Sequence, residues 1–135
     1  MESFKLSIFA PERRLTQDEL VTSFTVMTDQ GEIQVLPGHA DLIAALATGK
    51  FEYAPVGKAP VHGVISSGFL NIESGSVKVI AETLELAREI DVSRAREAQM
   101  KAEQMLNDAA LDSSSFRKYQ LKLERALIRQ SIGGA

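Results

Sequence analysis

The stretch LNIESGSVKVIA, residues Leu70–Ala81, decides the fold of the first half of this chain. Apolar Leu70 and Ile72 alternate with polar residues before its centre, and Val77 and Val79 alternate with polar residues after it. A period of two is typical of half-buried strands, and the Glu-Ser-Gly sequence between the two runs favours a turn. The stretch therefore predicts a β-hairpin with one buried face.

The same alternation recurs upstream, at Phe4–Ile8 and at Phe51–Tyr53. Turn-forming residues separate the runs at Asp29–Gly31, Pro37–Gly38, Thr48–Gly49 and Pro55–Pro60. Short strands at regular spacing, divided by turns, are typical of an antiparallel sandwich or barrel. We therefore predict that residues 1–82 form an all-β domain, a flattened sandwich or barrel.

Downstream of the hairpin the period changes. Residues 76–132 contain neither glycine nor proline, and from about Asp91 small and apolar residues recur at helical spacing. After a break near residues 107–115, a second apolar stripe follows, and the helix that carries it is expected to end before Gly133. The first stripe consists of Ala95, Ala98, Ala102, Met105 and Ala109, and the second of Phe116, Tyr119, Leu123 and Leu127. Residues 83–135 are thus predicted to form an antiparallel two-helix hairpin, which makes the fold class α+β.

The last helix is strongly basic. Residues 113–135 carry one acidic and five basic side chains, although the whole chain has a formal net charge of −3. Four of the basic residues fall on one face, beside an apolar line of Leu121, Ile128 and Ile132. They are Lys118, Lys122, Arg125 and Arg129. Such a face either meets a partner or is a solvated surface, and the pattern alone leaves both interpretations open.

Composition excludes several classes of function. The 135 residues contain no cysteine, which excludes thiol nucleophiles, disulfides and cysteine-ligated zinc. His39 and His62 have no third ligand at metal spacing, so no metal site is predicted. The net negative charge argues against a nucleic-acid binder. The longest apolar run, Leu42–Ala47, is too short to cross a bilayer, so any membrane association should be peripheral.

Catalytic motifs are also lacking. Gly49-Lys50-Phe51 and Gly57-Lys58-Ala59 have neither the upstream glycine nor the following Ser or Thr of a phosphate-binding loop. His39 and Asp41 could act as an acid–base pair with Ser66 or Ser67 as nucleophile, but no G-x-S-x-G turn accompanies them. We therefore predict a non-catalytic chain that requires no cofactor or metal.

Four motifs, in order, resemble the epsilon subunit (delta/epsilon type) of F-type ATP synthases. They are Gly31–Leu42 (GEIQVLPGHADL), Ser67–Leu70 (SGFL), Val77–Ala81 (VKVIA) and Ile90–Ala95 (IDVSRA). The departures are local, such as Gln34 where the family has glycine. The resemblance covers nearly the whole chain, and it implies a β-sandwich of about ten strands followed by a helical hairpin.

The resemblance also implies a rotor function. The sandwich would bind the gamma shaft and the membrane c-ring, and so couple proton flow to ATP synthesis. By carry-over, Glu32, Pro37, Gly38 and His39 would contact the shaft or ring, because a rigid Pro-Gly turn suits a polar interface. The alternative is that Gly38 only sets the turn and His39 only caps it.

The hairpin would then be regulatory. In the resembled family it can extend towards the catalytic alpha and beta subunits and inhibit ATP hydrolysis, and the basic face of the last helix would meet acidic residues there. Some members bind ATP through residues matched here by Asp91, Arg94, Arg125 and Arg129. Lys101 and Lys118 stand where such members have arginine, which should lower the affinity. The alternative is that Asp91 is simply a helix N-cap.

The resemblance places the chain on the cytoplasmic face of a bacterial plasma membrane, and the lack of a transit peptide agrees with that expectation. Two other functions stay open on the sequence alone. One is a free ATP-sensing module, and the other is a β-sandwich that binds a carbohydrate or peptide ligand.

Overall fold

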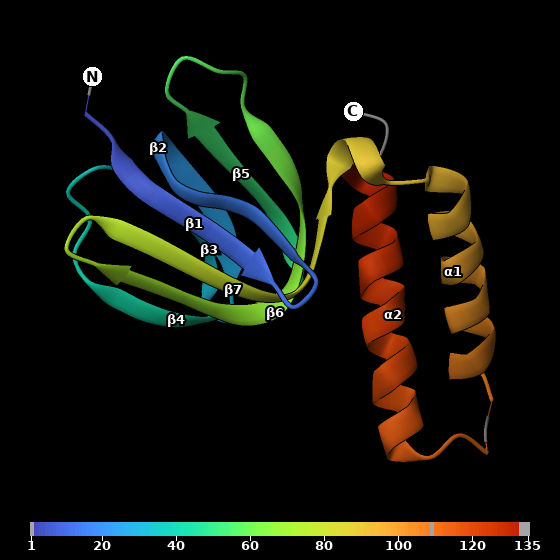
Figure 1. Ribbon diagram of the computed structural model, residues 1–135. Coiled ribbons are helices and arrows are strands. Elements are labelled where there is room, and N and C mark those ends of the chain that lie inside the picture. Colours follow the sequence, from blue (N-terminus) through green and yellow to red (C-terminus); the bar gives the residue numbers. More distant parts are fainter. Residues whose placement is uncertain (1, 109, 133–135) are drawn as a thin grey trace. The chain divides into compact units, whose positions relative to one another are not determined.

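The computed structural model describes residues 2–108 and 110–132 (Figure 1). The chain forms two compact units, the first ending at Leu86 and the second beginning at Ala87. The sequence-based boundary between residues 82 and 83 falls four residues earlier, within the last strand. Ala109 and the Gly133–Ala135 stop expected for the second helix lie outside the described residues.

The first unit is a β-sandwich. Its described residues form seven strands: β1 (Phe4–Ala10), β2 (Arg13–Thr28), β3 (Gly31–Val35), β4 (Leu42–Leu46), β5 (Gly49–Pro55), β6 (Val61–Glu73) and β7 (Ser76–Leu86). They follow the hydrogen-bonded order β1-β7-β6-β4-β2-β3, while β5 pairs with β2 and β6, and β1 also pairs with β2. The sheet therefore closes on itself.

The closing pair, β1 with β7, is parallel, whereas the sequence predicted only antiparallel strands. The ring β1–β2–β5–β6–β7 contains five strands, and each of its other four pairs is antiparallel. When neighbouring strands alternate in direction around a closed ring with an odd number of strands, the last pair of strands must be parallel. The parallel pair is thus a consequence of closure.

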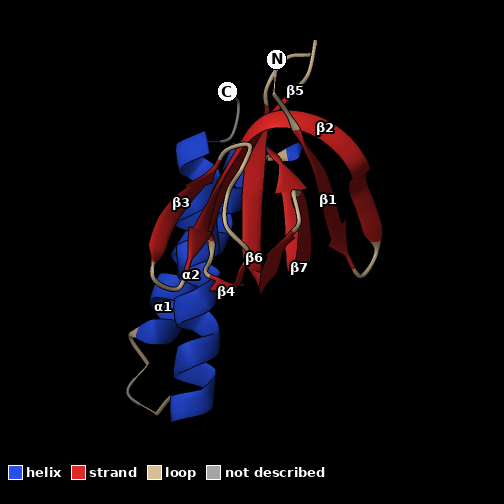
Figure 2. Ribbon diagram, turned by 90° about the vertical axis from the view of Figure 1, so that its left-hand side faces the viewer, coloured by secondary structure: helices blue, strands red, loops and turns tan. Residues whose placement is uncertain are grey.

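The expected count of about ten strands was too high, because the long strands of this sandwich bend without ending. β2 is 16 residues long and curves through the fold (Figure 2). It bulges against β1 near Asp18, whose φ is +50° and whose N–H donates to the buried Oγ of Ser7 at 2.9 Å. β6 pairs with β5 through Ile65 and with β4 from Gly68 onwards. A bent strand of this kind takes the place of two shorter ones.

The alternating apolar residues form the core, as predicted. Leu70, Ile72, Val77 and Val79 of the Leu70–Ala81 stretch are all at most 2% exposed. The same core contains Phe4, Leu6, Ile8, Phe51 and Tyr53 from the upstream runs. Each predicted turn falls between two strands, and the period of two correctly identified the runs in β1, β5, β6 and β7 and their buried faces. It did not identify β2, β3 or β4.

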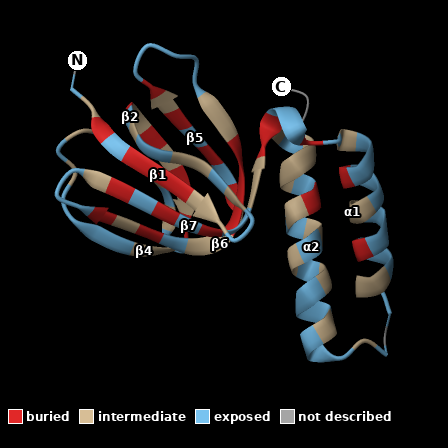
Figure 3. Cartoon of the chain, in the orientation of Figure 1, coloured by how far each residue is buried: buried red, intermediate tan, exposed pale blue. Residues whose placement is uncertain are grey.

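The second unit is the helical hairpin. After a short 3₁₀ turn (Ala87–Glu89), α1 spans Val92–Leu106 and α2 spans Ser113–Ile132. The buried positions face one another across the pair (Figure 3): Ala95 and Ala102 on α1, and Ala126 on α2. Gln130 Nε2 donates to Gln99 Oε1 at 2.6 Å and links the two helices. Phe116 and Leu127 of the predicted second stripe are 45% and 47% exposed, whereas Tyr119 and Leu123 are half-buried. The alanines are therefore buried more deeply than that stripe.

Asp112 caps the N-terminus of α2. The backbone N–H of Ser115 donates to its Oδ1 at 2.7 Å, and the Ser114 hydroxyl donates to the same atom at 3.2 Å. These hydrogen bonds hold the pKa of the Asp112 carboxyl below its usual 3.8, and the bond from the Ser115 backbone has the largest effect. Because the folded-state pKa is the lower one, the cap stabilises α2 fully above pH 3.8 and is lost as the pH falls through the folded value.

We expect Asp112→Ala to lower the helical circular dichroism at pH 7 and to flatten its decline between pH 4 and pH 2. Asp112→Asn is the control, since its amide oxygen still caps but does not titrate. The measurement is far-ultraviolet circular dichroism during acid titration. Identical curves for Asp112→Ala and the unchanged chain would mean that the cap contributes nothing to the stability of the hairpin.

Within the described ranges, neither helix has the length and apolar character needed to span a membrane.

Candidate functional site

The Pro37–Gly38 turn links β3 to β4. The N–H of His39 donates to the carbonyl of Leu36 at 3.2 Å, and Gly38 has a φ of +87°. Proline at the second position and left-handed glycine at the third are the requirements of a type II turn. The turn is therefore rigid, and the structure shows it at the position that the sequence predicted.

His39 and its neighbour Asp41 are held by the chain around them. His39 Nδ1 lies 2.7 Å from the carbonyl oxygen of Ala40, a contact that needs the ring proton on Nδ1. Asp41 Oδ1 accepts the N–H of Ser74, which ties this loop to the β6–β7 turn. Glu32 lies separately, exposed near the start of β3. The contact roles of Glu32, Pro37, Gly38 and His39 stay predictions.

An apolar row, which was not predicted from the sequence, crosses the outer face of the sandwich. Phe69 of β6 lies opposite both Ala45 of β4 and Ile80 of β7, and Ile80 lies beside Phe9 of β1. Paired residues point to the same face of a sheet. Phe69 is 63% exposed and Ile80 is 60% exposed, and Ile43, on the same face of β4 as Ala45, is 75% exposed. We call Ile43, Ala45, Phe69, Ile80 and Phe9 the outer apolar row.

One signal could have found this row. In a strand with one buried face, the residues that are out of phase with the core should be polar. Phe69 and Ile80 are apolar residues at such out-of-phase positions, next to the buried Leu70 and Val79. Large apolar side chains gathered on an exposed face are typical of an interaction surface.

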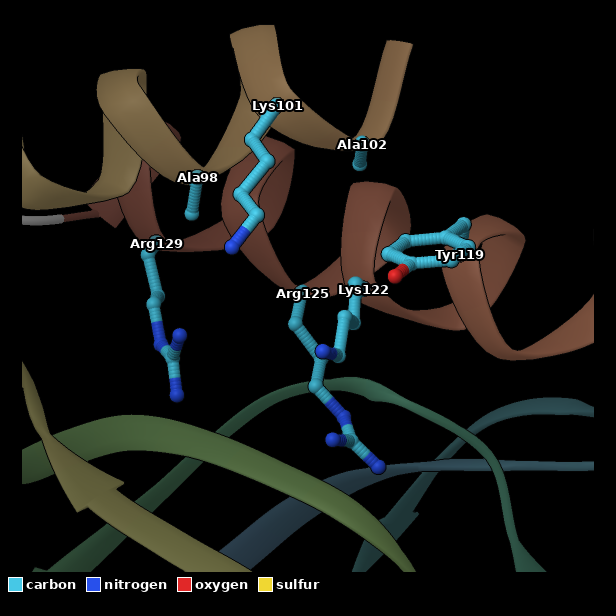
Figure 4. Close-up of a pocket in the computed structure, with 7 residues that line it drawn as sticks. All are labelled: Ala98, Lys101, Ala102, Tyr119, Lys122, Arg125 and Arg129. Atoms are coloured by element: carbon cyan, nitrogen blue, oxygen red, sulfur yellow. The ribbon is translucent and has the colours of Figure 1, made fainter. Parts of the chain in front are cut away.

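The hairpin contains a cavity of about 290 Å³. Ala98, Lys101 and Ala102 of α1 line it, together with Tyr119, Lys122, Arg125 and Arg129 of α2 (Figure 4). Lys101 extends from α1 towards α2, whereas the guanidinium groups of Arg125 and Arg129 extend from α2 away from α1 (Figure 4). We call these seven residues the hairpin cavity.

The hairpin cavity is electropositive. Lys101, Lys122, Arg125 and Arg129 contribute four cationic groups, and none of its described lining residues is acidic. The Nε of Arg125 is buried and has no hydrogen-bond partner among the described residues. An unpaired buried donor is unfavourable and is relieved by an acceptor such as a phosphate oxygen. The arrangement can bind an anion.

Three of the four residues of the predicted basic face line this cavity. The fourth, Lys118, lies outside the lining, and its ammonium is 5.7 Å from the centre of the Tyr119 ring. Tyr119 also receives the Lys122 ammonium, at 5.2 Å. The sequence pattern placed Tyr119 only in the apolar stripe. Its place between two lysines, at i−1 and i+3, was the available signal.

Asp91 and Arg94 do not line the cavity. Asp91 is the N-cap of α1, and its Oδ1 accepts the N–H of Arg94 at 3.2 Å. The structure thus brings Arg125 and Arg129 together with Lys101 and Lys122, but it leaves this first pair at the start of α1. Nucleotide contact by Asp91 and Arg94 stays a prediction.

Two family models match the chain, one for each unit. Residues 3–87 match the beta-sandwich domain of the ATP synthase delta/epsilon chain, and residues 80–132 match the long alpha-helix domain of the same chain. Among solved structures, a chain in the mitochondrial ATP synthase OSCP/F1/c-ring of Euglena gracilis has the same fold. Its TM-score is 0.86 at 24% identity, and the match covers 96% of this chain and 80% of that one.

Curated relatives match over nearly their full length. The ATP synthase epsilon chain of Geotalea daltonii is 36% identical over 133 residues, which cover 98% of this chain and 95% of the relative. The epsilon chain of Pediococcus pentosaceus is 33% identical, with 94% of this chain and 92% of the relative covered. The chain therefore belongs to the delta/epsilon chain family of ATP synthase, as a non-catalytic, epsilon-type subunit.

Proposed function

We propose that the chain is a central-stalk subunit of a proton-translocating ATP synthase, which couples proton flow to ATP synthesis. Its partners are the gamma subunit and the c-ring, on the cytoplasmic side of a bacterial plasma membrane. The observation that carries this proposal is that both units of the family are present in order, over residues 3–87 and 80–132. The bacterial origin of the relatives supports the location.

The outer apolar row is the surface that we assign to the gamma shaft. Burial of exposed apolar side chains is the main favourable term in a lasting association, and a shaft subunit must stay bound while torque passes through it. The rigid Pro37–Gly38 turn suits the second, more polar contact with the loops of the ring.

The hairpin acts as a brake on ATP hydrolysis. Lys118, Lys122, Arg125 and Arg129 give α2 a cationic face that fits acidic surfaces of the alpha and beta subunits. Each exposed pair contributes only about 0 to 1 kcal/mol and is screened by salt. The inhibition should therefore be graded and should weaken as the ionic strength rises.

ATP is the regulatory ligand that the hairpin cavity supports. Both helices supply lining residues, so a bound polyanion stabilises the folded hairpin over any state in which α1 and α2 separate. A ligand shifts such an equilibrium only by its difference in affinity for the two states. ATP should therefore oppose the brake.

The first test compares the full chain with a chain that ends at Ala87. This end point keeps all of β7, whereas stopping after Thr83 would remove Leu86, which is 3% exposed in the core and pairs with Gly63. Each version is titrated into an F1 core that lacks its epsilon subunit, and both binding and ATP hydrolysis are measured. We expect both versions to bind and only the full chain to slow hydrolysis, several-fold at low salt.

The two parts of the proposal fail separately. If both versions bind and slow hydrolysis equally, the hairpin is not the brake, although the stalk function stands. If neither version binds, the stalk function is wrong. The free ATP-sensing module and the β-sandwich that binds a carbohydrate or peptide ligand then become the candidate functions.

A further inference from the structure

We propose that Arg14 gives the outer apolar row a cationic end, which binds a carboxylate of the shaft subunit and so fixes the direction in which the row lies on the shaft. The partner surface that fits is an apolar strip with an acidic side chain at one end. This inference rests on the assignment of the row to the gamma shaft. It goes beyond that assignment by naming a specificity-determining residue and the chemistry that it recognises.

Arg14 continues the row onto a fifth strand. Arg14 of β2 lies opposite Phe9 of β1, and its guanidinium carbon is 5.4 Å from the centre of the Phe9 ring. Before Phe9, the row passes through the paired positions Ala45, Phe69 and Ile80. The line therefore crosses β4, β6, β7, β1 and β2, and it is apolar until its last position.

A bulge in β2 holds the Arg14 side chain in place. Nη1 of Arg14 donates to Oε1 of Gln17 at 2.8 Å. Gln17 precedes Asp18, whose φ is +50° and whose N–H donates to the buried Oγ of Ser7 at 2.9 Å. A bulge re-aims the side chains beside it, and a side chain that is already held loses less conformational entropy on binding. Arg14 is therefore preorganised.

The charge of Arg14 is not neutralised within the chain. Its hydrogen-bond partner, Gln17, is neutral, and no ion pair to Arg14 occurs among residues 2–108 and 110–132. A guanidinium stacked on an aromatic ring still has N–H groups at its edge, and these bind a carboxylate through two parallel hydrogen bonds. Aromatic residues and arginine are both enriched in the centres of protein interfaces. The exposed Arg14 on Phe9 thus fits an acidic group of a protein partner.

The single charged end distinguishes the two directions of the row. The opposite end lies on β4, which consists only of apolar residues from Leu42 to Leu46. A partner bound in reverse would place its acidic group against β4, where the group would be desolvated without a partner. A second copy of this chain does not fit, because its row offers either the same cation or the apolar β4. The shaft subunit is therefore the occupant that we assign.

The test measures the affinity of full-length variants for an F1 core that lacks its epsilon subunit, at low and at high salt. We expect Arg14→Ala to weaken binding by about tenfold at low salt, the size of one lost charged hydrogen bond. The loss should shrink as the ionic strength rises, because salt screens a charge pair at the end of an interface. Arg14→Lys should recover only part of the affinity, since lysine keeps the charge but not the two-point contact.

Gln17→Met tests the preorganisation. Methionine has a similar length but a much weaker acceptor, so Arg14 loses its hydrogen bond, and binding should weaken by about threefold. The same substitution in an Arg14→Ala chain should change nothing further, because Gln17 acts only through Arg14. Equal losses in both backgrounds would overturn the positioning role of Gln17. Circular dichroism checks that every variant folds.

Lys50→Ala is the matched control. Lys50 is an exposed cation of β5, a strand that contributes nothing to the row, so its loss should change the affinity by less than about twofold. Equal losses for Lys50→Ala and Arg14→Ala would overturn the inference, because only the net charge of the chain would then matter. A loss at Arg14 that is the same at low and high salt would also overturn it, because Arg14 would then act only by covering Phe9.

The remaining outcomes separate this inference from the assignment of the row. If Phe69→Lys, at the middle of the row, weakens binding and Arg14→Ala does not, the row binds the shaft, but its cationic end is not recognised. If neither substitution weakens binding, the row is not the shaft surface, and both are wrong. Sedimentation of the free chain detects a second copy on the row, and a dimer that Arg14→Ala dissociates would overturn the assignment to the shaft.

Discussion

Replacing Gly68 by alanine is expected to lower the free energy of unfolding of the β-sandwich by about 4 kcal/mol, the combined size of a left-handed backbone penalty and an overpacked core contact. Gly68 has a φ of +133°. A Cβ atom there would lie 2.0 Å from the carbonyl oxygen of Ile80 and 2.9 Å from the Cα of Ala81. Both neighbours are backbone atoms of β7, so neither can move aside without breaking the β6–β7 ladder.

Gly75→Ala is the matched control for the backbone penalty. Gly75 also has a positive φ, +79°, but a Cβ atom there meets nothing within 4 Å. Gly75→Ala should therefore lower the free energy of unfolding only by the backbone penalty, about 1 kcal/mol. Urea unfolding of the full chain, followed by near-ultraviolet circular dichroism from the buried Tyr53, measures both variants.

The difference between the two variants is the contribution of the close contact with β7. If both variants lower the free energy of unfolding equally, the close contact contributes nothing, because only the backbone penalty is common to the two positions. The position matters to the whole fold, since β6 leaves β5 and joins β4 at this point. A glycine that lets a strand bend without ending explains why this sandwich has fewer and longer strands than the resemblance implied.

The turns, the helices and the strands with a clear period of two were predictable, because each depends on residues close in sequence. The period of two placed Leu70, Ile72, Val77 and Val79 in the core, and the change to a helical period located α1 within two residues of its observed start. The pairing of the strands could not be predicted in the same way. β1 pairs with β7 in parallel because the ring closes, and no local sequence pattern indicates that closure.

The candidate site was predictable only in part, for a similar reason. Helical spacing placed Lys122, Arg125 and Arg129 on one face. It could not show that Lys101 of the other helix joins them, that Lys118 does not, or that two alanines line a cavity there. The outer apolar row is likewise a property of four paired strands. No single strand shows that Phe69, Ile80 and Phe9 lie side by side.

Replacing Phe69 by lysine is expected to weaken binding to an F1 core that lacks its epsilon subunit by about 100-fold, the size of a central interface residue worth roughly 3 kcal/mol. Phe69 is 63% exposed in the free chain, at the middle of the outer apolar row. Covered by the shaft, a lysine at this place would bury a charge with no partner that this chain provides. The fold should tolerate the change, because surface substitutions alter stability by only about 0.5 kcal/mol.

Val56→Lys is the matched control. Val56 is also apolar and 43% exposed, but it follows β5, a strand that contributes nothing to the row. Its substitution should change the affinity by less than about threefold. Ile80→Lys, opposite Phe69 on β7, should reproduce the large loss, because the two side chains form one surface. If both row variants bind as tightly as the unchanged chain, the row faces solvent in the complex, and the shaft must bind another face of the sandwich.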